Sequence, residues 1–463
     1  MTAERSPHTV TSLIKPAKVV NPHVPPHSTH IPLPRHSLYQ LLTVTSALVF
    51  PSLLDLERLQ RAISALAGWW PVIAGRLVYA PKTSTTDTHA ELSDFSIHLT
   101  ASDIPLDVVQ VETTSPYPLP NHHVVQPDLS PYITPLPLTY SVPGTDTPLL
   151  TFRLTQVRPL NASVLGISAC HGIVDGRTAN RMLHHLSELY RDPRATHLDM
   201  IPTFGPSVMS PPAPISTPEA GFYDPCTLTE MFGRIAESAT ESEPTTIVLT
   251  RAEVQNLRRS LGQDVSVSDQ DALTGWWVSV LDRLGERVDL LWYAVNYRDL
   301  FPDHPLYPSS VSTNFYSEIA FAPFALESRH IPSQSAAQVA VDVRHAIQRL
   351  RAEPERWAGY LDHIGHKLEQ GRIDQAGLHM IPPAGSAVIN SNLMYDWTPT
   401  FGQSGSVYYH TEHTCRRFLR VFRANRTHKG VWDGSVELAT QIPLGSGAKL
   451  VELVQSDKEQ WAR

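Results

Sequence analysis

A histidine lies where a buried strand is expected to give way to a helix. The apolar, β-branched run 164–170 predicts the strand, and apolar residues recur at helical spacing over 179–186. His171 follows the strand, and Asp175 and Gly176 come shortly after it. Because an unperturbed imidazole titrates near neutral pH, a histidine in this place can accept a proton in a transition state. The pattern predicts general-base chemistry at His171, and the alternative is a structural histidine that ends a strand.

Two further groups of side chains suggest other chemistry. Cys170 beside His171 suggests a cysteine–histidine nucleophile pair, but adjacent residues of a strand point to opposite faces. We therefore expect Cys170 to be a buried structural cysteine. The histidine pairs 122–123 and 184–185 suggest a metal site, but neighbouring histidines do not easily share one ion and no cysteine or carboxylate cluster joins them. We expect no bound metal.

Composition limits the class of protein. The chain has 463 residues, of which 41% are hydrophobic, enough to bury the cores of two domains of about 200 residues each. A net charge of −8 without a lysine and arginine run gives no attraction for nucleic acid or an anionic membrane. Three widely spaced cysteines argue against a disulfide framework. With neither a signal peptide nor an apolar stretch near the roughly 18 residues of a membrane span, we expect a cytoplasmic protein.

The N-terminal part of the chain predicts a helix and a pair of strands. An apolar stripe with a period of 3.6 residues runs over 53–66, and Ser52 and Asp55 form a Ser-x-x-Asp capping pattern at its start. A strand over 149–157 precedes the strand of 164–170, and the short connection between them predicts antiparallel neighbours.

A proline-rich segment of low periodicity, 201–244, divides the chain. We interpret it as a crossover that belongs to neither core, between an N-terminal half (1–200) and a C-terminal half (245–463). Capping patterns at Thr250 and Ser268 each open a helix in the second half. The strands expected there are 247–249, 290–296, 314–320, 388–393, 418–424 and 435–442. Because each half mixes strands with helices, the predicted class is α/β.

Several segments resemble, in order, motifs of the BAHD acyl-CoA-dependent acyltransferases. Residues 171–176, HGIVDG, match the family's HxxxDG motif, and 70–77, WPVIAGRL, are similar to its FYPLAGRL segment. Residues 266–277, SVSDQDALTGWW, are similar to its VSTHDALTALIW segment. The NYR of 296–298 resembles the NxR element, and Asn314 falls where the family has a Gly-Asn pair. Several matches in the right order are more specific than any single motif.

The resemblance implies both a fold and an activity. The fold would be chloramphenicol-acetyltransferase-like, with two similarly sized domains of mixed sheet plus helices and an active-site channel between them. The activity would be acyl transfer from acyl-CoA, a co-substrate rather than a bound cofactor, to a hydroxyl or amine of a small-molecule acceptor of specialised metabolism. His171 would act as general base in a ternary complex, without an acyl-enzyme. We expect a monomer.

The resemblance also suggests roles for other residues. Asp175 either orients His171 or, as the likeness implies, pairs structurally with Arg298 in a buried ion pair, while Gly176 gives the turn room for close approach. Asn390 and Asn392 alternate on a predicted strand, so their amides face the same way at positions that the likeness places near the tetrahedral centre. They are candidate oxyanion donors, and the alternative is an asparagine pair that ends a strand.

The C-terminal part departs from the family pattern. Its DFGWG signature survives only as Thr400-Phe401-Gly402, and Asn392 replaces the tryptophan of its SW pair. Thr400 cannot make the carboxylate contact that the family's aspartate is thought to make with the NxR arginine, and Asp396 is a candidate substitute. This end is more similar to divergent fungal members of the family than to plant ones.

Two other functions compete with acyl-CoA chemistry. A free-standing condensation-type domain would accept acyl groups from a carrier protein, although such domains usually have a second histidine where this chain has Cys170. A non-catalytic, family-like protein would bind a partner instead. The intact His171 argues against this second alternative, whereas the degraded motif at 400–402 favours it.

Overall fold

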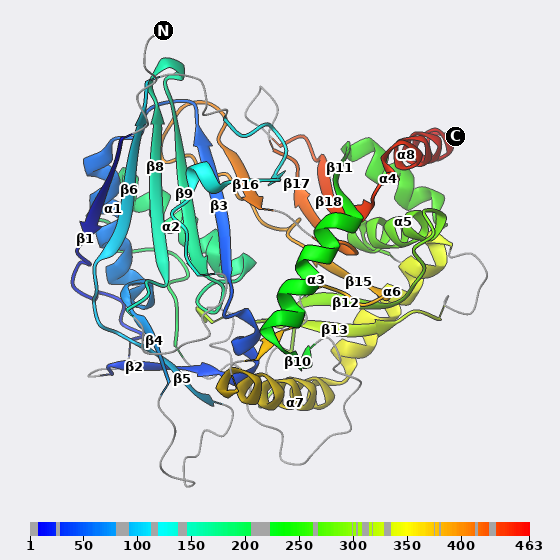
Figure 1. The fold of residues 1–463 in the computed structure, drawn as a ribbon, viewed down its shortest axis with the longest axis horizontal. Helices are drawn as coiled ribbons and strands as arrows, with labels where there is room; N and C mark the ends of the chain where they lie inside the picture. Colours follow the sequence, from blue (N-terminus) through cyan, green and yellow to red (C-terminus); the bar gives the residue numbers. More distant parts are fainter. Residues whose placement is uncertain are drawn as a thin grey trace.

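Two large sheets lie side by side in the computed structural model of this protein (Figure 1). The structure describes residues 8–24, 28–79, 92–112, 119–137, 146–204, 223–262, 267–298, 300–301, 304–307, 314–316, 318–327, 335–374, 376–378, 381–412, 415–425 and 432–463. One sheet is built mainly from the first half of the chain and the other from the second half, each with helices packed against it. The fold is the expected α/β arrangement of two sheet-plus-helix domains.

The N-terminal sheet carries the strand that leads to His171. It has seven strands in the order β1-β6-β8-β9-β3-β16-β7. Strands β8 and β9 are antiparallel neighbours, as expected from the sequence, and β9 also pairs with β3. Helices α1 and α2 pack against each other. The bounds are β1 His8–Ile14, β3 Thr43–Phe50, α1 Leu56–Trp69, β6 Ile104–Val111, β7 Val125–Gln126, β8 Leu150–Val157, β9 Ala162–Cys170, α2 Gly176–Arg191 and β16 Tyr408–Glu412.

The C-terminal sheet has six strands in the order β11-β18-β17-β15-β12-β13. Strand β15 is parallel to both of its neighbours, β12 and β17. Helix α5 packs against α4 and α6, and α4 also contacts α8. The bounds are β11 Ser242–Leu249, α4 Arg251–Ser260, α5 Asp269–Arg283, β12 Val288–Asn296, β13 Ile319–Ala325, α6 Ala336–Ala352, β15 Gly385–Ser391, β17 Phe418–Arg423, β18 Val436–Pro443 and α8 Gly447–Trp461.

Smaller elements join the two halves. Helix α7, from the second half, packs against the short 3-10 helix η1 of the first half, and η1 leads into β3. Two minor sheets have the orders β2-β5-β4 and β10-β14. The bounds are β2 His30–Pro34, η1 Arg35–Gln40, η2 Pro71–Ala74, β4 Arg76–Tyr79, β5 Leu92–His98, η3 Ser130–Tyr132, η4 Arg158–Leu160, β10 Pro225–Cys226, α3 Leu228–Glu241, α7 Pro354–Ile373 and β14 Gly377–Leu378.

The division between the halves differs from the sequence expectation in two ways. The segment 201–244, expected to be a linker, contains helix α3 and the first residues of β11. A Thr227 capping box starts α3, and the proline density around it masked this signal. Strand β16 belongs to the second half in sequence but pairs with β3 and β7 in the N-terminal sheet. The second half therefore contributes one strand to the N-terminal sheet.

Most predicted helix starts are present, with one change of residue. Thr250 and Ser268 cap α4 and α5 through the expected capping boxes. Helix α1 is capped by Asp55, whose carboxylate accepts the Arg58 N–H at 2.7 Å, whereas the Ser52 hydroxyl donates to Gln403. The capping residue is therefore Asp55 rather than Ser52, because Ser52 lies too far before the first turn.

The strand expected at 314–320 begins only at Ile319. The reason is the position of the Arg298 side chain. Arg298 donates to the carbonyls of Asn314 and Tyr316, so these carbonyls are not available to a sheet ladder.

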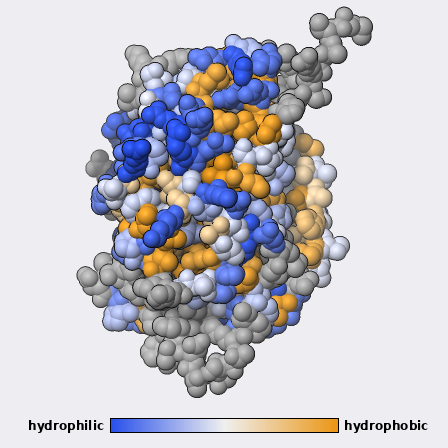
Figure 2. All heavy atoms as spheres, turned by 90° about the vertical axis from the view of Figure 1, so that its left-hand side faces the viewer, coloured by the Kyte–Doolittle hydropathy of each residue, from blue (hydrophilic) through white to orange (hydrophobic). Residues whose placement is uncertain are grey.

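One outer face of the molecule mixes hydrophobic and hydrophilic residues (Figure 2). Exposed apolar side chains such as Val10 and Leu13 lie on the edge strand β1. Among the helices that the structure describes, none is long and apolar enough to cross a membrane.

Gly166, in the middle of β9, is required by a close backbone approach. A Cβ atom at this position would lie 1.7 Å from the carbonyl oxygen of Tyr132. We expect Gly166→Ala to lower the free energy of unfolding by at least about 1–3 kcal/mol, measured by denaturant titration. The control is Gly233→Ala in helix α3, where a Cβ meets nothing within 4 Å, so stability should stay equal or rise by about 0.5–1 kcal/mol. Equal stability of Gly166→Ala and the wild type would contradict the packing argument.

Candidate active site

His171 is held by its backbone at the end of β9. Its N–H donates to the carbonyl of Leu42 at 2.7 Å, and its own carbonyl accepts the Val174 N–H at 3.3 Å. The side chain is only partly exposed, and Nδ1 is buried without a hydrogen-bond partner among the described residues. The strand end therefore fixes the backbone from which the imidazole projects.

The surroundings of His171 favour the neutral imidazole. Burial lowers its pKa below the ordinary value of 6.5, and the positive charge of Arg420 acts in the same direction. The backbone carbonyl of His171 and the carboxylate of Asp175 oppose this change only in part. A histidine that is neutral at pH 7 is in the form needed to accept a proton.

Asp175 is a fully buried helix cap. Its Oδ1 accepts the N–H groups of Arg177 at 2.9 Å and Thr178 at 3.0 Å, which are the first residues of α2. Its Oδ2 accepts the Glu318 N–H at 2.9 Å and Arg298 Nη1 at 2.5 Å. Both oxygens are used in this way, so the carboxylate points into the protein rather than at the ring of His171.

The Asp175–Arg298 pair suggested by the resemblance is present, and both side chains are fully buried. Burial alone would raise the pKa of Asp175, but Arg298 and the backbone N–H donors lower it below its usual value. A carboxylate with a lowered pKa stabilises the fold at neutral pH, and this contribution is lost as the pH falls through the lowered value. The geometry supports the structural alternative for Asp175 over the orienting one.

Sequence reasoning missed three residues that surround this pair. Glu318 is fully buried and contributes its negative charge to Arg298. Tyr297 and His36 are also buried, and the Tyr297 hydroxyl contacts His36 Nε2. No local pattern identifies these residues, because His36 comes from a distant part of the chain and Glu318 lies outside any regular strand.

Gly176 makes room for side chains rather than for backbone. A Cβ atom here would lie 2.7 Å from Asn392 Oδ1 and 3.3 Å from a ring carbon of Tyr395. Asn392 is buried, and its Nδ2 donates to Asn390 Oδ1 at 3.3 Å. The two asparagines therefore contact each other, although Asn392 lies one residue beyond the end of β15. Asn390 is less buried, and no acceptor among the described residues is recorded for its Nδ2.

Asp396 does not replace the missing aspartate as a partner of Arg298. Its Oδ1 accepts from the backbone N–H and the hydroxyl of Thr398, at 3.1 and 2.7 Å. Its backbone carbonyl accepts from Asn180 and His184 of α2. Thr400 is exposed and does not contact Arg298 either. The loop therefore covers α2 through its backbone, and Glu318 supplies the second carboxylate near Arg298.

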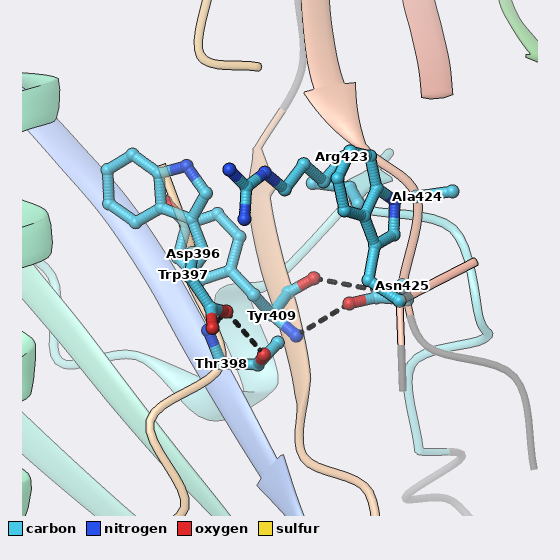
Figure 3. A pocket seen from close by; sticks show the side chains of 9 residues that line it. Asp396, Trp397, Thr398, Tyr409, Arg423, Ala424 and Asn425 are labelled. Atoms are coloured by element: carbon cyan, nitrogen blue, oxygen red, sulfur yellow. Dashed lines mark hydrogen bonds between the residues drawn. The ribbon is translucent and has the colours of Figure 1, made fainter. Parts of the chain in front are cut away.

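The same loop forms one wall of a small pocket (Figure 3). Trp397 stacks on Tyr409 with ring centroids 4.6 Å apart, and the Arg423 guanidinium lies 4.6 Å from the ring centroid of Trp432. Arg423 also donates to the carbonyls of the loop residues Leu393 and Met394. The aromatic and arginine side chains thus fix the loop on β16 and β17.

Cys170 and His185 have structural roles. Cys170 is fully buried, and burial raises its pKa to about 12, so it is not a thiolate at neutral pH. His185 accepts from Trp70 Nε1 at 3.0 Å and contacts the Asp199 carbonyl, while burial lowers its pKa to about 4. Within the described ranges, no group of three or more histidine, cysteine, aspartate and glutamate residues could hold a metal ion.

Comparison with solved structures identifies the fold. Vinorine synthase matches with a TM-score of 0.60 and 16% identity over 97% of this chain and 98% of that chain. F. graminearum TRI101, in complex with coenzyme A and T-2 mycotoxin, matches with a TM-score of 0.61 and 15% identity, covering 94% and 98%. The first condensation domain of the CDA synthetase matches with a TM-score of 0.52 and 14% identity, covering 94% and 96%.

No protein-family model matches the chain, and no curated protein matches it. The solved structures show that this protein has the fold of the BAHD acyltransferases. The particular reaction has to be argued from the site itself.

Asp175→Asn removes the charge of the side chain but keeps its capping function, because asparagine also caps helices well. We expect Asp175→Asn to lower the free energy of unfolding by about 3–5 kcal/mol, since the fully buried Arg298 would lose the carboxylate that it bonds to directly. The matched control is Asp55→Asn, the exposed cap of α1, where the loss should stay within about 0.5 kcal/mol. If Asp175→Asn is as stable as the wild type but inactive, the result would instead favour a role of Asp175 in orienting His171.

Proposed function

We propose that this protein is an acyltransferase that moves an acyl group from acyl-CoA to a hydroxyl or amine of a small-molecule acceptor, with His171 as general base. The observation that supports this most directly is His171 itself, a backbone-fixed and partly exposed imidazole whose pKa is lowered by burial. The fold neighbours support the choice of donor, because TRI101 was crystallised with coenzyme A together with T-2 or with deoxynivalenol. The acceptor belongs to specialised metabolism, and the protein works as a cytoplasmic monomer.

In this proposal His171 takes the acceptor's proton as the acceptor attacks the thioester carbonyl. The carbonyl becomes a tetrahedral oxyanion, which then collapses and expels the CoA thiolate, and the imidazolium returns its proton to the leaving sulfur. General-base assistance of this kind raises the rate by a factor of about 10²–10⁴, and holding both substrates in one complex raises the rate further. The buried Cys170 is not available as a nucleophile, so the acyl group passes directly to the acceptor without an acyl-enzyme.

Asn390 is proposed as the oxyanion donor. Of the two asparagines, Asn392 has its amide committed to Asn390 and lies against Gly176. The amide of Asn390 can therefore donate to the oxyanion, while Asn392 positions it. One donor aimed at developing charge contributes about 3 kcal/mol of transition-state stabilisation.

A carrier-protein-dependent condensation-type reaction is the second candidate. It is favoured by the match to a condensation domain. The chain has Cys170 where such domains usually have a further histidine, and that cysteine is fully buried here. A family-like binding protein without catalysis is the third candidate, and the partial exposure and lowered pKa of His171 argue against it.

The deciding experiment is a screen of the purified protein against acyl-CoAs and polycyclic alcohol or amine acceptors, with released free thiol as the readout. We expect acceptor-dependent thiol release, with the acylated acceptor detected by mass spectrometry. The same screen with acyl groups loaded on a carrier protein distinguishes the second candidate, the condensation-type reaction, from acyl-CoA chemistry. Binding of acyl-CoA without turnover of any acceptor would favour the third.

His171→Ala tests the general base. We expect kcat to fall by about 10²–10⁴ with the melting temperature unchanged, because Nδ1 of the ring bonds to none of the described residues. In the wild type, the acidic limb of kcat/KM should lie below the ordinary histidine value of 6.5, since burial lowers the pKa. The exposed His197 provides the control, and His197→Ala should leave turnover unchanged. Retention of more than about a tenth of kcat in His171→Ala would exclude the role.

Asn390→Ala tests the oxyanion donor. We expect kcat to fall by roughly 10–1,000-fold with little change in acyl-CoA affinity, because the bond strengthens only in the transition state. Asn392→Ala should also lower kcat, since it supports the amide of Asn390. Ser391, which points the other way on β15, is the control and should tolerate alanine. Equal losses at all three positions would indicate a damaged strand.

A further inference from the structure

A small cavity lies apart from the residues proposed for catalysis (Figure 3). Its walls include the loop 396–398, Tyr409 of β16, the segment 423–425 at the end of β17, and Trp432. None of its described lining residues is a catalytic candidate. Its volume is about 30 Å³, which is room for about two water molecules. The cavity can therefore hold only a small group.

Most polar side chains around the cavity already have hydrogen-bond partners (Figure 3). Asn425 Oδ1 accepts the Tyr409 N–H at 2.9 Å, and Asn425 Nδ2 donates to the Tyr409 carbonyl at 2.9 Å. Trp432 Nε1 donates to a backbone carbonyl at 2.7 Å. Asp396 Oδ1, from the acidic residue of the wall, accepts from the N–H and the hydroxyl of Thr398. These side chains build the walls of the cavity.

The indole N–H of Trp397 is a donor without an acceptor. Trp397 is 7% exposed, and its ring stacks on Tyr409 with centroids 4.6 Å apart. Its Nε1 atom is buried and has no hydrogen-bond partner in the part of the chain that the structure describes. A buried indole N–H usually finds a partner, because its loss of water is otherwise not compensated. Figure 3 shows this nitrogen on the side of the ring that faces the Arg423 guanidinium.

Arg423 provides a second donor and a positive charge. Its Nε and Nη2 donate to the carbonyls of Leu393 and Met394 at 2.9 and 3.1 Å. Its Nη1 has no acceptor among the described residues, and no described carboxylate forms an ion pair with it. The guanidinium lies over the ring of Trp432, which attracts the cation but does not neutralise it. Burial raises the pKa of Tyr409 to about 12, so its phenol adds no negative charge either.

We propose that this cavity binds the carboxylate of a small organic acid, with one oxygen on Trp397 Nε1 and the other on Arg423 Nη1. Two donors that face each other across a narrow space match the two oxygens of a carboxylate, and the guanidinium charge strengthens the contact. A phosphate group carries more charge and three acceptor oxygens, which exceeds what two donors and one cation supply. The small volume selects acetate-sized acids, or the carboxylate end of a larger acid whose remainder lies outside the cavity.

The acid would be a ligand in addition to the substrates of the proposed acyl transfer. By holding Nη1 of Arg423, it would also fix the guanidinium that binds the carbonyls of Leu393 and Met394. The loop between β15 and β16 would become more stable in consequence. Binding can be measured on the purified full chain whether or not an acyl acceptor is found, so this proposal and the proposed function can fail separately.

The first experiment follows the indole N–H groups by NMR. Labelling with ¹⁵N-tryptophan makes the nine indole N–H groups visible, and Trp397→Phe identifies the resonance of Trp397. We expect sodium acetate, at constant ionic strength, to shift this resonance saturably, because a charged acceptor would bond to the proton. Acetamide has nearly the same shape without the charge and should shift the resonance far less.

Trp357 is the internal control for this titration. Its Nε1 is likewise buried without a partner among the described residues, but Trp357 does not line the cavity. Its resonance should stay unchanged. The absence of a saturable Trp397 shift up to about 100 mM acetate, or an equal shift with acetamide, would overturn the proposal.

The second experiment measures acetate affinity in variants from the broadening of the acetate methyl resonance. Trp397→Phe keeps an aromatic ring on Tyr409 but removes the donor, and Arg423→Gln removes the charge. We expect each to weaken acetate binding by about tenfold or more. The matched control is Arg153→Gln, which removes an arginine that donates to backbone carbonyls away from the cavity and should leave the affinity unchanged. Unchanged affinity in Trp397→Phe would exclude the assigned contact, even if Arg423→Gln does not fold.

Discussion

The fully buried ion pair between Asp175 and Arg298 is the constraint around which the site is built. Asp175 receives two N–H groups from the start of α2, one from Glu318 and one guanidinium bond. These bonds join three segments that are far apart in sequence. A buried carboxylate is tolerated only when its acceptor capacity is filled in this way, so these bonds hold the turn between β9 and α2 in place.

Because Asp175 is used in this way, no carboxylate of the described residues is bonded to the His171 ring. The imidazole is placed by the strand end and by the Leu42 carbonyl, and its basicity is set mainly by burial. The arrangement separates two tasks that a Ser-His-Asp triad combines in one hydrogen bond. Here Arg298 and its neighbours maintain the geometry, and burial lowers the pKa of the base.

Elements that depend on neighbouring residues could be predicted from local patterns in the sequence. Strand β9, the caps of α4 and α5 and the turn at 171–176 all depend on neighbouring residues, and the structure contains them. Helix α3 was missed because prolines around it obscured the Thr227 capping box. Glu318 and His36 could not be found from the sequence, because the burial of such side chains depends on segments that are distant in the sequence. Asp396 was a wrong candidate for the partner of Arg298 for the same reason, since spacing along the chain does not fix where a loop side chain points.

Strand β16 has a consequence for how the chain is made. It occupies a place beside β3 in the N-terminal sheet, yet it is synthesised after most of the C-terminal half. During translation β3 therefore presents an open edge, with unpaired N–H and C=O groups, while some 350 further residues emerge. An open edge is a template for pairing with other chains. The N-terminal sheet is therefore completed only after β16 has emerged from the ribosome.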